Sequence, residues 1–488
     1  MHMQHTSPNI PIVLIVGMVL GLATGLFGLK ALLLIVGAPV VLLLLLHPQW
    51  CFWLLVAAIP VTIDFGQGLT VTRVVIPVVA LGILSNALIR RCPWPNPLGS
   101  TAARVGSLFF LSILLSLAVA WLTQRVPLDM LRLNKELAGY ATRVAMFFVT
   151  LSFVRRPQDV RQVVLVLVLV GILEALIVVA QIHFRLVLPG DWRFSSIARV
   201  DSTEGTFRAE GTTPHPIYLA GFLQMVLPFA VLLLLRARLF WRLPLATAIA
   251  LMLYAWYAAY SRSSLLALVL MLAVALYFFT RFGRAVVVIG FLGFLALLAA
   301  HAWSLPDLAQ TLEEIRHFGK AVRSDQLTSV AGSLQFRIES SVGGWNLFMA
   351  HPLFGVGLAQ AIHEYMQYLP GWAVSPFHPE VIHNSFFEVA SENGVFALFF
   401  LLWLWFIAFR GVASAWNDPE LSFYARALFV ALVGQVFFLS MTPMVRDIWF
   451  TLPLAAAFGE IMTVKARKRE DQPDAPPQTA STSALGAA

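Results

Sequence analysis

The sequence predicts an all-α polytopic membrane protein with 12 to 14 transmembrane helices. Of its 488 residues, 59% are hydrophobic and 12% are charged, whereas an average soluble domain has about 25% charged residues. Apolar runs recur from Asn9 to Val464, and each approaches the roughly 20 helical residues that cross a hydrocarbon core. The composition excludes a soluble enzyme and a nucleic-acid binder, so membrane lipids are expected partners and nucleic acid is not.

Apolar periodicity and length identify fourteen candidate spans. They are 9–28, 31–46, 51–64, 71–89, 104–122, 136–154, 161–183, 215–235, 242–260, 263–280, 285–303, 384–409, 422–440 and 447–464. Two early segments are short enough to be re-entrant or fused, which gives the range of 12 to 14. The first run continues into further spans without a small-residue cleavage site, so we expect a retained helix and not a signal peptide.

Basic residues fall on alternate connections between these segments. They are Arg90, Arg91, Arg155, Arg156, Arg236, Arg238, Arg242, Arg281, Arg284, Arg410, Lys465, Arg467, Lys468 and Arg469. The positive-inside rule makes those connections cytoplasmic, and both termini are then cytoplasmic. The tail, 465–488, is rich in Pro, Ala, Ser and Thr after Glu470 and is predicted to be disordered.

Two connections on the opposite face are too long to be turns, namely 184–214 and 304–383. They divide the chain into N-terminal membrane helices (1–303), a large outer loop (304–383) and C-terminal membrane helices (384–464). The large loop mixes aromatic residues with polar residues of helical period. We therefore expect short amphipathic helices that lie on the bilayer.

Three strings in this region contain the candidate site residues. Arg262 follows Tyr260 and Ser261 at the outer end of a span, where a guanidinium and helix N–H groups can bind phosphate. A topology-setting or snorkelling arginine is the alternative explanation.

The second string carries Arg337 and runs on to His351–Pro–Leu–Phe–Gly–Val–Gly at 351–357. The two glycines of this turn permit a close backbone approach or a positive φ. A surface helix with its stop signal would explain the glycines but not the whole string.

The third string begins with His383–Asn384–Ser385 and puts Asn384, Glu388, Ser391 and Glu392 on one helical face. Such a polar stripe at membrane depth is expected to line a cavity. His383 is the residue whose ordinary pKa suits a general base near neutral pH, although a lone histidine at a helix start is more often a structural hydrogen bonder.

Weaker candidates are Arg208 and His215 beside the shorter outer loop, and Asp447, for which a local ion pair with Arg446 is the likelier explanation. The chain has no DxD, HExxH or Walker-type loop. We therefore expect no metal and no cofactor, and Asp64 is the first ligand to examine if metal is needed.

Arg262 in an R-x3-L arrangement, Arg337 upstream of the 351–357 string, and the His383–Asn384 start with Gly394 ten residues later resemble the O-antigen ligase and polymerase superfamily. The resemblance implies a C-type glycosyltransferase-like fold in the bacterial inner membrane, with a large periplasmic loop and a periplasmic active site. It also implies transfer of a glycan from undecaprenyl pyrophosphate to lipid A–core oligosaccharide.

Related activities stay open at this point. An O-antigen polymerase uses the same donor, with basic residues spread over two long loops, and a protein O-oligosaccharyltransferase typically has a further periplasmic domain. A transporter or flippase of lipid-linked glycan would have paired charges within several spans and symmetric halves. Arg143, a cation without an obvious counter-ion in the sixth span, keeps that alternative open.

Overall fold

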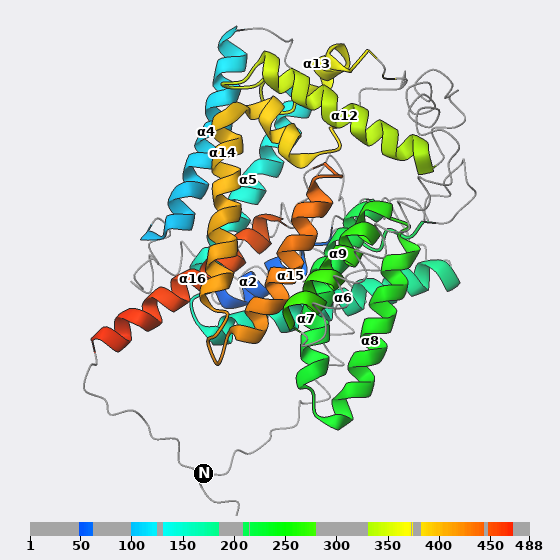
Figure 1. Cartoon of the computed structure of the whole chain (residues 1–488), viewed down its shortest axis with the longest axis vertical. Helices are drawn as coiled ribbons and strands as arrows, with labels where there is room; N and C mark the ends of the chain where they lie inside the picture. The colour runs from blue at the N-terminus through cyan, green and yellow to red at the C-terminus, as the bar shows by residue number, and fades with distance from the viewer. Residues whose placement is uncertain are drawn as a thin grey trace, which may run out of the picture.

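The computed structural model describes residues 48–61, 99–123, 130–184, 208–213, 215–279, 330–371, 373, 382–443 and 448–471. Every regular element within these ranges is a helix, which confirms the all-α class (Figure 1). The expected spans 9–28, 31–46, 71–89 and 285–303 lie outside the described residues.

Seven of the described helices are long and apolar enough to cross a membrane. They are α4 (Thr101–Thr123), α6 (Pro157–His183), α7 (Pro216–Arg236), α8 (Leu239–Ala258), α14 (Ser385–Ser414), α15 (Ser422–Leu439) and α16 (Ile448–Glu470). The protein is therefore a multi-pass membrane protein. The total of 12 to 14 crossings stays a prediction.

Three further helices correspond to weaker apolar segments. α5 (Met130–Phe153) is long enough to cross but carries several charged residues, and α9 (Arg262–Phe279) has a shorter apolar part. α2 (Pro48–Ala57) is only 10 residues long, because its chain turns at Ala58 to Pro60 where the sequence predicted a span to residue 64.

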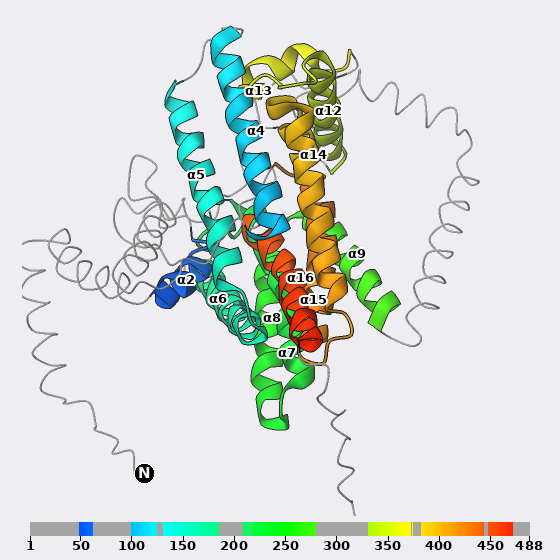
Figure 2. The same cartoon turned by 90° about the vertical axis from the view of Figure 1, so that its left-hand side faces the viewer.

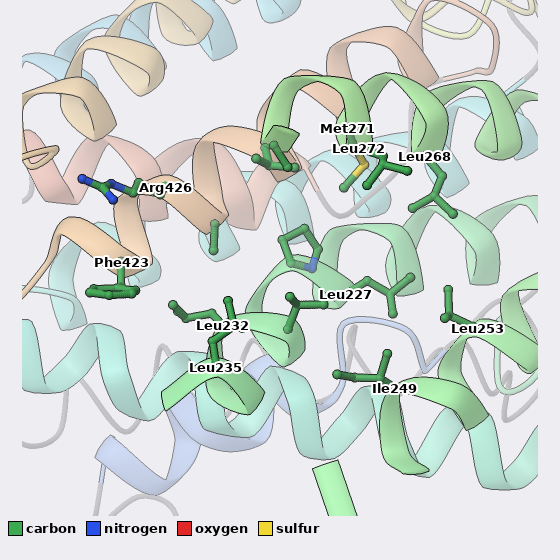
Figure 3. A pocket seen from close by; sticks show the side chains of 15 residues that line it. Leu227, Leu232, Leu235, Ile249, Leu253, Leu268, Met271, Leu272, Phe423 and Arg426 are labelled. Carbon is green, nitrogen blue, oxygen red and sulfur yellow. The ribbon is translucent and has the colours of Figure 1, made fainter. Parts of the chain in front are cut away.

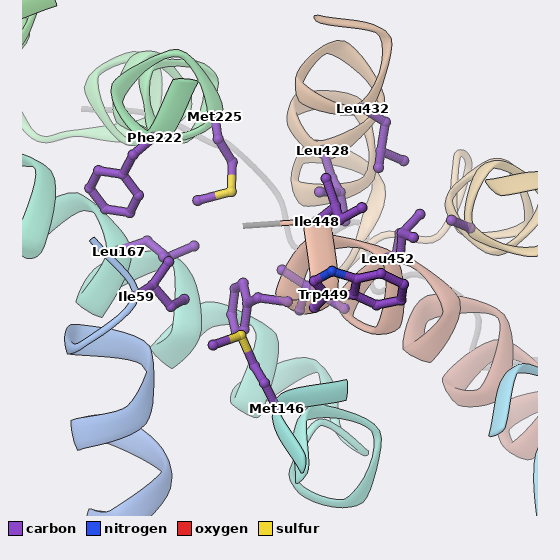
Figure 4. Packing of buried hydrophobic residues seen from close by; sticks show 14 of the residues in the cluster. Ile59, Met146, Leu167, Phe222, Met225, Leu428, Leu432, Ile448, Trp449 and Leu452 are labelled. Atoms are coloured by element: carbon purple, nitrogen blue, oxygen red, sulfur yellow. The ribbon is translucent and has the colours of Figure 1, made fainter. Parts of the chain in front are cut away.

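The interior of the bundle is packed with aliphatic and aromatic side chains from helices far apart in the sequence. Figure 4 shows Leu167 of α6, Phe222 of α7, Leu428 of α15 and Trp449 of α16 converging there. Trp449 is fully buried, and its ring centroid lies 5.1 Å from that of Phe109 on α4. Because lipid tails are as apolar as these side chains, close packing rather than the hydrophobic effect holds such helices together.

The described part of the large loop forms a small cap with its own core. It contains α12 (Val330–Ala350), α13 (Ala361–Glu364) and the 3-10 helix η3 (Tyr365–Tyr368). Buried side chains of Leu347, Val356, Ala361, Tyr365 and Ile382 hold these pieces together. Figures 1 and 2 show the cap at one end of the molecule, beside α4 and α14, and the α7–α8 turn at the other.

The cap differs from the expected set of short helices, because α12 is a single helix of 21 residues. No proline interrupts it before Pro352. Its Gly343 and Gly344 do not end the helix, since both pack closely: an added Cβ would lie 2.9 Å from a side chain of Leu369 or of Ile382. α13 and η3 are therefore short, as predicted, whereas α12 is longer than predicted.

The C-terminal helix also runs further than expected, to Glu470 instead of residue 464. Lys465 donates to both carboxylate oxygens of Asp418 at 3.0 Å and to Glu420 at 2.7 Å. Asp418 in turn accepts the backbone N–H groups of Glu420 and Leu421 just before α15. This ion-pair cluster ties α16 to the α14–α15 turn.

The Asp418 carboxylate makes stability depend on pH. Burial raises its pKa, but hydrogen bonds from Lys465 and from two backbone N–H groups outweigh that effect and hold the pKa below its ordinary value. This stabilisation is complete above the ordinary aspartate pKa and is lost as pH falls through the lowered one.

Asp418→Asn is expected to cost about 1.5–3 kcal/mol at neutral pH and to flatten the acid limb of Tm against pH. Glu420→Gln, at an exposed partner, should cost less, and equal losses would contradict this account.

Candidate active site

α14 is broken at Gly394, near the end that faces the cap. The backbone there has φ 78° and ψ −174°, which leaves the helix and which side chains resist. A Cβ on Gly394 would collide with the carbonyl group of Leu353. The next residue, Val395, donates its N–H to the Pro352 carbonyl at 2.8 Å. The short part of α14 before Gly394 therefore turns away from the long part that follows it.

The turn at 351–357 fills this break, as its glycines predicted. Val356 donates its N–H to the Ser391 carbonyl at 3.0 Å, and Gly357 donates to the Glu392 carbonyl at 2.8 Å. These carbonyls belong to the last turn before the break and have no continuing helix to bond. The turn thus satisfies backbone carbonyls that would be costly to leave without a hydrogen bond when buried.

His383 and Asn384 stand immediately before α14. The Asn384 side chain is the N-cap and accepts the backbone N–H groups of Phe386 and Phe387 at 3.1 and 3.2 Å. The half-buried His383 donates its backbone N–H to the Ser340 hydroxyl at 3.0 Å, and its ring meets that of Phe336 edge to face at 5.1 Å. Asn384 therefore orients the helix start, and α12 supports the imidazole.

Arg337 lies on the same turn of α12 that contacts His383. It sits between Phe336 and Ser340, is half-buried, and its carbonyl accepts the Ser341 hydroxyl at 2.7 Å. The fold therefore brings two candidate residues to one junction, although 45 residues separate them in the sequence. In the polar stripe behind His383, Ser391 is fully buried and Glu388 is half-buried, and the cavity that the stripe was expected to line stays a prediction.

Two side chains of α6 hold the segment 208–213 by hydrogen bonds. Gln181 forms a pair of hydrogen bonds with the backbone of Gly211, donating at 2.9 Å and accepting at 3.1 Å. Glu174, also on α6 and buried, accepts the Thr212 N–H at 2.8 Å and the Thr212 hydroxyl. Gly211 has φ 62°, and a Cβ there would collide with the Glu174 carboxylate. The segment is held by an amide and a carboxylate.

These hydrogen bonds fix the segment that begins with Arg208, which lies beside the start of α9. The Arg208 guanidinium donates to the Tyr260 carbonyl at 3.3 Å and to the Ala259 carbonyl at 3.4 Å. Arg262, two residues after Tyr260, is the first residue of α9, as the sequence predicted. Tyr260 itself has a positive φ of 49°, uncommon for a tyrosine. Two predicted arginines therefore belong to one connection.

His215 is the N-cap of α7, and this role explains its position. Its Nδ1 accepts the Ile217 N–H at 3.1 Å, so the proton of a neutral imidazole is on Nε2. Its ring lies 6.2 Å from that of Tyr218. Asp447 and Asp64 lie outside the described residues.

Arg143 was predicted to lack a counter-ion, and this prediction is wrong. Arg143 lies 4.0 Å from the Glu136 carboxylate and 4.5 Å from the centre of the Tyr140 ring. The Glu388 carboxylate of α14 adds a further attraction from another helix. The spacing of 136, 140 and 143 on one helical face could have indicated the first two partners, whereas the interhelical one depends on packing. Arg143 therefore has a counter-ion in Glu136, but one pair within one helix falls short of the paired charges in several spans that a transporter would have.

One family of known proteins matches part of the chain. Residues 247–402 match the family model described as O-Antigen ligase, which confirms the resemblance for this region. The match includes Arg262, Arg337, the 351–357 turn and His383, whereas Arg208 and His215 lie before it. No curated protein matches the sequence.

Substitution of Gly394 should disrupt the site without touching a candidate catalytic group. Gly394→Ala forces a side chain into a positive φ, which costs about 1–3 kcal/mol, and it adds the collision with Leu353. We expect a lower Tm in detergent and loss of most activity. Gly371→Ala is the matched control, because nothing lies within 4 Å of a Cβ there. A Gly394→Ala protein with the Tm and activity of Gly371→Ala would show that the break is dispensable.

Proposed function

We propose that this protein is an O-antigen ligase. It would transfer a glycan from undecaprenyl pyrophosphate to lipid A–core oligosaccharide at the periplasmic face of the bacterial inner membrane. The observation that carries the proposal is the region 247–402, which matches the ligase family and contains Arg262, Arg337 and His383. Ligases and related polymerases share the lipid-linked donor, so the assignment of the acceptor is the finer part of the proposal.

Two arginines are proposed to bind the donor pyrophosphate. Glycosyl transfer from a pyrophosphate needs the negative charge that develops on the leaving group to be stabilised. A guanidinium does this with two parallel hydrogen bonds. Arg262 begins α9, where the helix N-terminus adds positive potential. Arg337 would approach from α12, and Arg208, which contacts the chain just before Arg262, would support it.

His383 is proposed as the general base. It stands at the outer end of α14 and is supported through α12 by Ser340 and Phe336. Its neutral imidazole would take the proton from an acceptor sugar hydroxyl as the oxygen attacks the anomeric carbon. The C–O bond to pyrophosphate breaks on the opposite face, so the configuration inverts. Asn384 and His215 serve as helix caps in this scheme and have no catalytic role.

Reconstitution separates a ligase from a polymerase. The purified protein is incubated with undecaprenyl-pyrophosphate glycan and lipid A–core, with and without EDTA. We expect glycan on lipid A–core in both conditions, because the arginines would supply the positive charge that a metal provides elsewhere. Lengthening of the lipid-linked glycan alone would identify a polymerase. Loss of product with EDTA and recovery with Mg²⁺ would contradict the metal-independent mechanism.

The histidine is tested by its pH profile. If neutral His383 is the base, the initial rate should rise with pH as the imidazole loses its proton and then become constant. His383→Ala should lose about 10²–10⁴ in rate and retain donor binding, whereas Arg262→Lys and Arg337→Lys should weaken it. His363→Gln, at an exposed histidine of the cap, and His215→Asn, which keeps a capping side chain, should stay active.

Two results would overturn the base assignment. One is an active His383→Ala protein with an unchanged acid limb. The other is an inactive His383→Ala protein that no longer binds the donor, which would place the histidine with the arginines at the pyrophosphate. Activity would then fall as pH rises.

A further inference from the structure

A groove lies between four helices, away from the candidate active site. Its cavity volume is about 400 Å³, within the range of small-molecule pockets. Figure 3 shows its walls, to which α7, α8, α9 and α15 contribute. The lining residues are Leu227, Pro228, Val231, Leu232, Leu235, Ile249, Leu253, Leu268, Met271, Leu272, Ala275, Phe423, Arg426, Ala427 and Val430.

The groove is apolar along its length and basic at one end. Arg426 is the charged residue in the lining and belongs to the first turns of α15, as does Phe423. The guanidinium of Arg236, the last residue of α7, stacks 3.6 Å above the Phe423 ring. The Arg426 guanidinium lies 5.9 Å from the centre of the Trp416 ring. Two arginines from different helices, Arg236 and Arg426, therefore lie beside aromatic rings at this end of the groove.

The basic mouth is at the end of the molecule that carries the α7–α8 turn, opposite the cap and His383 (Figure 1). Arg238 and Arg242 belong to the same turn region. By the positive-inside rule this end is cytoplasmic, and the cytoplasmic leaflet carries anionic phospholipids that basic pockets between helices recognise.

We propose that the groove binds an anionic phospholipid of that leaflet. One acyl chain would lie between α7, α8, α9 and α15, and its phosphate would accept hydrogen bonds from Arg426 and Arg236. The polyprenyl tail of the donor is the other lipid within reach. The groove residues on α9 begin at Leu268, six residues or about 9 Å beyond Arg262. A donor held at Arg262 would leave the two arginines at the far mouth without a phosphate, so charge complementarity favours the phospholipid.

Native mass spectrometry of the full-length protein in a neutral detergent tests this site. Phosphatidylglycerol and phosphatidylcholine are titrated separately into delipidated protein. We expect phosphatidylglycerol to bind more tightly, and Arg426→Gln or Arg236→Gln to weaken it about fivefold each, since one arginine near the membrane surface contributes about that factor. Arg410→Gln is the matched control, an exposed arginine at the same end that does not line the groove.

A second variant tests the apolar part. Ala275→Trp should fill the groove and reduce binding of both lipids, and its Tm without lipid shows whether it folds. Equal affinity for the two phospholipids, or unchanged phosphatidylglycerol binding in both arginine variants, would overturn the proposal. Displacement of phosphatidylglycerol by a polyprenyl phosphate whose own affinity is insensitive to Arg426→Gln would assign the groove to the donor tail.

Discussion

The backbone contact between Gly394 and the turn at 351–357 is the constraint on which the cap end of the protein depends. A break inside a buried helix leaves carbonyl groups without their helical partners, and buried carbonyls need hydrogen bonds. Val356 and Gly357 donate their N–H groups to the carbonyls of Ser391 and Glu392, and the Ser116 hydroxyl of α4 also donates to the Glu392 carbonyl. The turn and α4 together therefore stabilise the break. The same contact determines where α12 lies and therefore which of its side chains reach His383. Backbone hydrogen bonding thus positions residues that never touch the broken turn.

The connection at 208–213 is also held by hydrogen bonds to its backbone, but here the bonds come from side chains of α6. Gln181 and Glu174 are seven residues apart on α6, and together they bond the N–H and carbonyl groups of a segment that forms no helix of its own. A buried carboxylate is costly unless it is hydrogen-bonded, and Thr212 supplies both a backbone and a hydroxyl donor. Rigidity at this connection holds Arg208 against the start of α9. The turn at 351–357 and the segment 208–213 are therefore both irregular segments held by hydrogen bonds to a neighbouring helix.

Features that depend on local sequence could be predicted, and features that depend on packing could not. Apolar length predicted the helices around Leu167 and Phe222, and residue type predicted both the helix start at Arg262 and the glycine turn. The contact of His383 with Ser340 and the interaction of Arg143 with Glu388 join residues far apart in the chain. A hydrophobicity pattern carries no information about which helices are neighbours. The match over 247–402 covers Arg262, Arg337 and His383, the residues whose local strings were recognisable in the sequence.

The distribution of positive charge fits the proposed ligand, a pyrophosphate dianion that binds and is released in each catalytic cycle. Clustered cations repel one another in a low-dielectric environment, so an empty site must hold them apart or pair them. Arg208 is bonded to helix-end carbonyls, and Arg143 faces Glu136 and the Tyr140 ring. The candidate cations also lie on separate elements, with Arg337 on α12 and Arg262 on α9. A pyrophosphate bound by Arg262 and Arg337 would bridge α9 and α12. Donor binding would then itself complete the arrangement of positive charge that the leaving group requires.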